Sequence, residues 1–122
     1  MPKPGTALLV HWDDGEAQAC ARPLRDAGWH VHVESTSGSD AFAYAKKARP
    51  SVAVIYTTRL PSHSVSTARE LRGHSLTSRI PIVFVDRPGA APRIDTSVSP
   101  DALCTTDDDL VAVLAEIPEF LS

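Results

Sequence analysis

The sequence has few of the features that mark disulfide-rich, nucleic-acid-binding or membrane proteins. It contains only two cysteines in 122 residues, and they are not spaced as zinc ligands usually are. Acidic residues outnumber basic ones by 15 to 12, so there is no excess of positive charge for nucleic acid. No apolar run is long enough to span a bilayer, and the opening residues lack the apolar stretch of a secretory signal. We therefore expect a cytoplasmic protein that binds neither nucleic acid nor membrane.

The composition that remains is that of a folded domain. Hydrophobic residues make up 43% of the chain and charged residues 22%, which is too apolar for intrinsic disorder. A length of 122 residues is common for one domain and sufficient to bury a core without disulfides or metal. We expect residues 1–122 to form a single domain, with Cys20 and Cys104 as buried free thiols.

Short apolar runs alternate with segments of helical spacing. The continuous run at residues 52–56 is typical of a central parallel strand, whereas residues 29–33 alternate as at the edge of a sheet. Strands are expected at residues 7–10, 29–33, 52–56, 80–85 and 102–104. Helices are expected at residues 14–28, 41–48, 65–73 and 107–117. Residues 86–100 contain three prolines, which leave room for only a turn or two of helix.

This alternation predicts the fold class. Strands separated by helices of this length indicate βαβ units with right-handed crossovers. We therefore expect an α/β protein with a five-stranded parallel sheet and helices on both faces.

Several motifs give the sequence a resemblance to the response-regulator receiver domains of two-component signalling. They are Leu24–Val31, Ser37–Phe42, Arg49-Pro50, Leu60-Pro61 and Ile80–Phe84, in the family's order and near its spacing. The resemblance covers nearly the whole chain and implies a flavodoxin-like fold whose fourth helix is shortened or missing.

The residues that carry the family's chemistry are replaced in this sequence. The resemblance calls for an acidic pair that binds Mg²⁺, and an ungapped count places His11 and Trp12 there. A slip of two residues would offer Asp13 and Asp14 instead. The phosphoacceptor aspartate corresponds to Tyr56 when counted from Pro50, or to Thr57 when counted back from Pro61.

The two remaining positions of the family's site also differ. Asp86 stands where the family has a threonine or serine, and Thr105 or Thr106 stands where it has a lysine. An aspartyl phosphate requires a carboxylate nucleophile, and its charge is stabilised by cations. The replacements therefore predict a degenerate site, and Trp12 is expected to fill the space of the phosphate and Mg²⁺.

The resulting prediction is a pseudo-receiver, a signalling or adaptor module that is not an enzyme and needs no cofactor. It would act by protein contacts, independently of aspartyl phosphorylation. The resemblance implies that it binds another protein, or a second copy as a homodimer, through strand four, strand five and the last helix.

An alternative is a small-ligand or weak cation site formed by Asp13, Asp14 and Asp86, which would meet at the carboxyl edge of the sheet. Such carboxylates could bind Mg²⁺, but we expect no cofactor, because capping of the first helix by Asp13 or Asp14 is favoured over a cation site. His30 and His32 share one face of a strand and could ligate a metal, but no third ligand is apparent, which favours surface histidines.

Overall fold

Five parallel strands form one sheet in the computed structural model of the protein, which describes residues 5–57, 61–86 and 103–121. The strands are β1 (Thr6–Val10), β2 (His30–Glu34), β3 (Val52–Tyr56), β4 (Ile82–Asp86) and β5 (Leu103–Thr106). The helices are α1 (Asp14–Asp26), α2 (Gly38–Ala48), α3 (Pro61–Gly73) and α4 (Asp107–Leu121). The strand order is β2-β1-β3-β4-β5, and every neighbouring pair is parallel. The predicted α/β fold is therefore confirmed.

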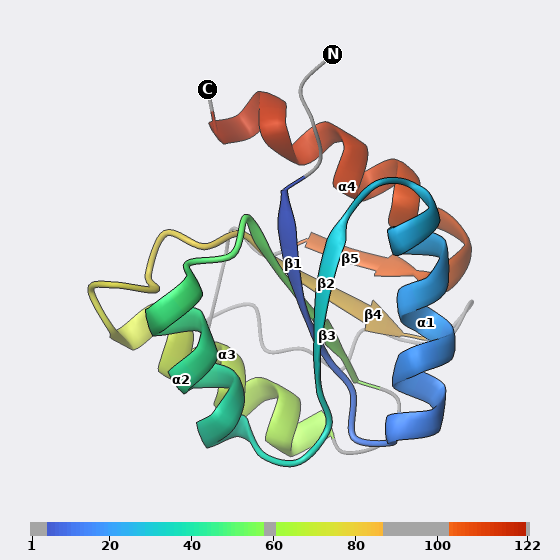
Figure 1. The fold of residues 1–122 in the computed structure, drawn as a ribbon. Coiled ribbons are helices and arrows are strands. Elements are labelled where there is room, and N and C mark those ends of the chain that lie inside the picture. The colour runs from blue at the N-terminus through green and yellow to red at the C-terminus, as the bar shows by residue number, and fades with distance from the viewer. Residues whose placement is uncertain (1–4, 58–60, 87–102, 122) are drawn as a thin grey trace.

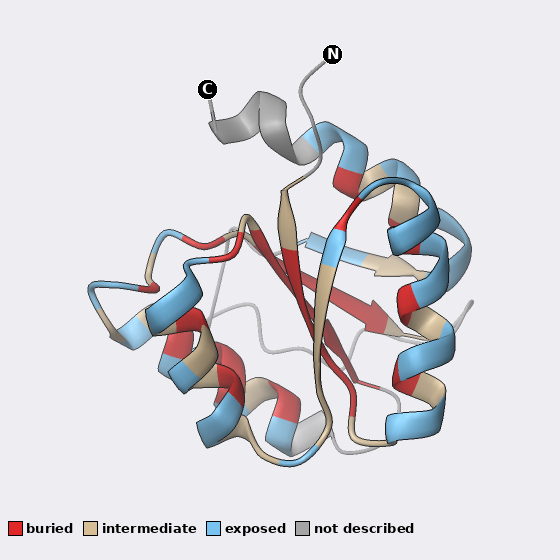
Figure 2. Cartoon of the chain, in the orientation of Figure 1, coloured by how far each residue is buried: buried red, intermediate tan, exposed pale blue. Residues whose placement is uncertain are grey.

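The helices form two layers around the sheet (Figure 1). Helices α1 and α4 pack against one face, where the apolar cluster includes Leu9, Val54 and Tyr56. Helices α2 and α3 pack against the other face, where the cluster includes Leu8 and Phe84. Strand β3 is buried along its whole length and β4 up to Val85, as Figure 2 shows, because both strands carry apolar side chains toward both layers.

Local sequence sets the ends of the first two helices. The Asp13 side chain accepts a hydrogen bond from the Glu16 backbone N–H and caps α1, and Ser37 caps α2 in the same way through Asp40. After α1 the chain turns at Gly28, whose φ of 101° lies in the left-handed region that glycine adopts without strain. This turn leads the chain from α1 directly back to the sheet at β2.

Two boundaries at the sheet edges differ from the sequence prediction. Strand β2 begins at His30, because Trp29 is only 5% exposed and packs into the core beside α1 and α4 instead of extending the strand. Strand β5 ends at Thr106 and is the other edge strand of the sheet. The prediction that both thiols are buried is wrong, because Cys104 is exposed on this edge strand and Cys20 is half-buried. The predicted short fourth helix would fall within residues 87–102, outside the described residues.

Within the described part of the chain, no helix is both long and apolar enough to cross a membrane.

Candidate functional site

The carboxyl ends of β1, β3, β4 and β5 meet at one edge of the sheet. His11 and Trp12 follow β1, Tyr56 ends β3 and Thr57 follows it. The strand register continues this alignment, since Val10 lies beside Ile55 and Tyr56 beside Val85. Asp86 ends β4 and lies beside Thr106. The structure therefore brings the positions of the predicted degenerate site together, at the edge where open α/β sheets bind their ligands.

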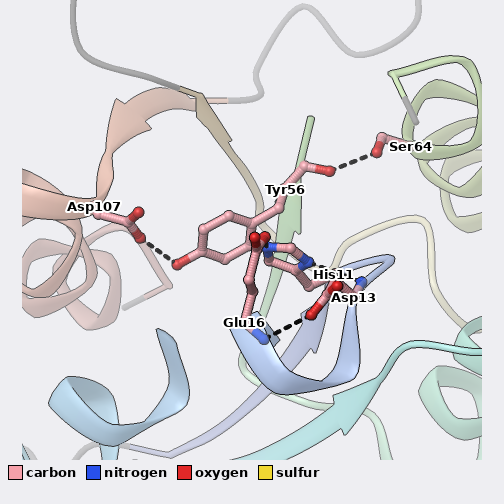
Figure 3. A network of polar contacts seen from close by, with 6 residues as sticks. All are labelled: His11, Asp13, Glu16, Tyr56, Ser64 and Asp107. Atoms are coloured by element: carbon pink, nitrogen blue, oxygen red, sulfur yellow. Dashed lines mark hydrogen bonds and ion pairs between the residues drawn. The ribbon is translucent and has the colours of Figure 1, made fainter. Parts of the chain in front are cut away.

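His11 is held in a buried polar network (Figure 3). His11 is only 2% exposed, and its Nδ1 accepts a hydrogen bond from the backbone N–H of Asp13 at 3.1 Å. A neutral imidazole that accepts at Nδ1 carries its proton on Nε2, and this nitrogen lies 3.2 Å from Glu16 Oε2. Both ring nitrogens therefore already have partners at the place where the resemblance expects a Mg²⁺ ligand.

Tyr56 links the end of β3 to the start of α4. Its ring lies in the apolar cluster, with its centroid 4.9 Å from that of His11, and its hydroxyl donates to Asp107 Oδ1 at 2.6 Å (Figure 3). Burial raises the pKa of Tyr56 far above its usual value, and the Asp107 hydrogen bond raises it further. Burial also raises the pKa of the neighbouring Cys20 thiol. Tyr56 is therefore a neutral structural group and not an exposed nucleophile.

Trp12 lies on the opposite side of β3 from α1 and α4. Its indole packs partly buried against the α2 and α3 cluster, and its Nε1 donates to Ser64 Oγ at 3.0 Å. Ser64 in turn donates to the Tyr56 carbonyl oxygen at 2.6 Å. The Trp12 side chain thus bridges the end of β1 to α3 across the end of β3, and the Tyr56 backbone carbonyl is already engaged.

The other predicted positions are also tied into the structure. The Thr57 hydroxyl donates to the Val85 carbonyl at 3.1 Å and is buried. Asp86 and Thr105 are half-buried at the ends of their strands. None of the described residues that end β1, β3, β4 or β5 is a lysine or arginine.

The magnesium site that the resemblance implies does not fit these residues. Mg²⁺ prefers oxygen ligands, whereas His11 offers nitrogens that are already paired and Trp12 offers no ligand. Asp13 caps α1, and Asp14 is exposed and accepts a hydrogen bond from Ser35 at 3.2 Å. Among the described residues, no three or more histidine, cysteine, aspartate or glutamate side chains gather as a metal site would need. Asp13, Asp14 and Asp86 are not gathered into such a group in this part of the chain.

The histidine pair on β2, His30 and His32, is likewise not part of a group of three or more metal-ligating side chains among the described residues. His32 stacks on Tyr44 with ring centroids 3.7 Å apart and contacts Glu34 at 2.9 Å, while His30 is exposed.

Three residues of this network were not found by the sequence analysis. Glu16, Ser64 and Asp107 were not among the predicted site residues. Asp107 does begin α4, but it also binds a tyrosine 51 positions away, and Ser64 binds a tryptophan 52 positions away. No local spacing signals such pairs.

Replacing Trp12 by alanine should lower the free energy of unfolding, measured by urea denaturation, by about 2 kcal/mol, because a half-buried indole loses its packing. Trp12→Phe keeps a ring but removes the donor to Ser64, and should cost about 1 kcal/mol. Equal losses in the two variants would show that the ring itself contributes no packing at this site.

No protein-family model and no curated protein matches the sequence. Solved structures do match its fold. A putative response regulator from Chloroflexus aurantiacus has 25% identity and a TM-score of 0.73, over 94% of this chain and 98% of that one. A CheY-like receiver domain protein from Methanospirillum hungatei has 21% identity and a TM-score of 0.77, over 96% of each chain. The pseudo-receiver domain of the CikA protein has 20% identity and a TM-score of 0.67, over 92% of this chain and 94% of that one. The chain therefore has the flavodoxin-like fold of response-regulator receiver domains.

Proposed function

We propose that this chain is a pseudo-receiver, a non-enzymatic signalling or adaptor module that acts by protein contacts without aspartyl phosphorylation. The observation that carries the proposal is the end of β3, where Tyr56 or Thr57 corresponds to the phosphoacceptor position of the family. Both residues have hydroxyls that are buried and hydrogen-bonded, to Asp107 and to Val85. Neither supplies the carboxylate that forms an acyl phosphate.

The charges around this position support the same conclusion. A phosphoryl group at the end of β3 would lie near the carboxyl side chains of Glu16 and Asp107. It would also lie beside β4, which ends in Asp86. Receivers stabilise that group with a cation and positive side chains, whereas His11 is the single basic side chain among the described residues at the carboxyl ends of the strands. The resemblance to a pseudo-receiver in the CikA protein is consistent with a receiver fold that has lost this chemistry.

The contact surface that we propose for a partner protein is the side formed by β4, β5 and α4. Strand β5 is a short edge strand, and its first residue, Leu103, is 41% exposed. An exposed apolar side chain next to an open strand edge is a feature of protein interaction surfaces. We expect this contact to take place in the cytoplasm. A homodimer through the same side is the alternative occupant of this surface.

The proposal is tested by thermal melts of the purified chain with Mg²⁺, and with Mg²⁺ plus beryllofluoride, a mimic of the aspartyl phosphate. We expect no change in Tm in either case, because a binding site that exists only in the folded state would raise Tm. A receiver domain with its acidic residues intact serves as the positive control in the same buffers.

Mg²⁺ and beryllofluoride test different parts of the proposed function. A rise in Tm with Mg²⁺ alone would support the alternative cation site and would be traced with Asp13→Asn, Asp14→Asn and Asp86→Asn variants. A further rise with beryllofluoride would overturn the claim that phosphorylation chemistry is lost.

A further inference from the structure

The outer edge of β2 is the second open edge of the sheet, opposite β5 (Figure 1). A groove of about 430 Å³ lies beside its first half and is lined by His30, Val31 and His32 of β2, by Thr6 at the start of β1, and by Arg25, Trp29 and Tyr44. Arg25 lies on α1, on one face of the sheet, and Tyr44 lies on α2, on the other face. The groove therefore lies at the edge of the sheet and not within either layer. An extended chain pairs with an open sheet edge of this kind through backbone hydrogen bonds.

The hydrogen bonds of β2 show which backbone groups face this groove. His30 donates its N–H to Gly5 and the Glu34 carbonyl accepts from His11, so the even-numbered residues bond to β1 and the residues that follow it. The alternate residues, Val31 and Val33, therefore direct their N–H and C=O groups outward. Arg25 Nη2 reaches the Val31 carbonyl at 3.2 Å from this outer side, which agrees with the assignment.

We propose that this edge binds a second copy of the chain, with β2 pairing antiparallel to its own copy around a two-fold axis at His32. In this register Val31 exchanges two hydrogen bonds with Val33 of the second copy, and Val33 does so with Val31. The two sheets then join into one. A carbonyl oxygen has two lone pairs, so Val31 can keep its Arg25 contact while it accepts the new bond.

The pattern of polar side chains on β2 is what selects a copy of itself over another strand. In the proposed register His30 lies opposite Glu34 of the second copy, and Glu34 lies opposite His30. These side chains share one face of the strand with His32, whose ring is stacked on Tyr44 and whose Nε2 lies 2.9 Å from Glu34 Oε1 within its own chain. The second carboxylate oxygen of Glu34 can accept a hydrogen bond from the His30 ring of the second copy, and the two-fold symmetry repeats the pair. Strand β2 is therefore complementary to itself when it runs antiparallel.

The association is tested by sedimentation equilibrium of the full chain over a range of concentrations, where we expect a dimer. His30→Glu, at an exposed position, should weaken dimerisation about tenfold, because it places two carboxylates opposite each other at both ends of the pair. The exchanged variant, His30→Glu with Glu34→Lys, should restore it. Thermal melts of each variant show whether the fold is retained.

Leu103→Glu is the matched control, because it places a similar charge on the opposite edge of the sheet. It should leave the β2 dimer intact. If Leu103→Glu dissociates the dimer and His30→Glu does not, the copies associate through β5, and the proposal is wrong. A monomer at every concentration would also overturn it.

The register is tested separately by cysteine crosslinking in a Cys104→Ser background. A cysteine introduced by His32→Cys would face its own copy across the axis, at a separation that a disulfide spans. His30→Cys would face Glu34 and should not crosslink. Equal crosslinking of the two variants under mild oxidation would contradict the proposed register.

Discussion

Replacing Tyr56 by aspartate is expected to destabilise the protein by about 4 kcal/mol or more and to restore no phosphorylation. Counted from Pro50, Tyr56 occupies the phosphoacceptor position, so the substitution reintroduces the family's aspartate in sequence. In the structure, however, the Tyr56 ring fills the core between the sheet, α1 and α4. The variant would leave a cavity and would bury a carboxylate in the place of a group that donates to Asp107.

The loss is measured by urea denaturation, and two matched variants separate its causes. Tyr56→Phe keeps the ring and loses only the hydrogen bond to Asp107, at a cost of about 1 kcal/mol. Tyr56→Asn has the size of aspartate without its charge, so the difference between the asparagine and aspartate variants gives the cost of the buried carboxylate. A stable aspartate variant that gains Mg²⁺-dependent phosphorylation from a small phosphodonor would contradict both this prediction and the proposed function.

Replacing Phe84 by alanine is expected to lower the free energy of unfolding by about 3–5 kcal/mol, the range for a large aromatic removed from a core. Phe84 is 1% exposed in the middle of β4 and packs with Leu8, Ile55 and Leu71 beneath α2 and α3. The cluster around it combines branched side chains on the strands with small and branched ones on α2 and α3, and such a close-packed core does not collapse far into the space left behind.

The same denaturation experiment on Leu103→Ala provides the control. Leu103 lies on the neighbouring strand but is 41% exposed, so its truncation should cost less than about 1 kcal/mol. Equal losses at Phe84 and Leu103 would mean that the β5 edge is covered and that the proposed partner surface is not available.

The fold could be predicted from the sequence because its signals are local. The continuous apolar run at Val52–Tyr56 can be satisfied only where both faces of a strand are covered, and the alternation of His30–Glu34 marks an edge. Both assignments follow from the side chains of a few consecutive residues. The carboxyl edge could be predicted for the same reason, since parallel strands all end on one side.

What the sequence did not reveal depends on neighbours that are distant in the chain. The exposure of Cys104 follows from the position of β5 at the sheet edge, which the residues around it do not specify. The choice between Tyr56 and Thr57 could not be made by counting, because the two landmarks differ by one residue. Their side chains have separate roles in the structure, since Tyr56 reaches α4 and the Thr57 hydroxyl returns to β4.

The strand order also determines how the chain can assemble as it is synthesised. Strand β1 pairs with β2 and β3, so these three strands and the helices between them can associate before β4 and β5 have been made. Contacts between distant parts of a chain form late because closing a long loop costs entropy. Tyr56 and Asp107 are 51 residues apart, and their hydrogen bond joins the first half to the last helix. On a ribosome, the apolar surface around Tyr56 would therefore stay uncovered until α4 emerges.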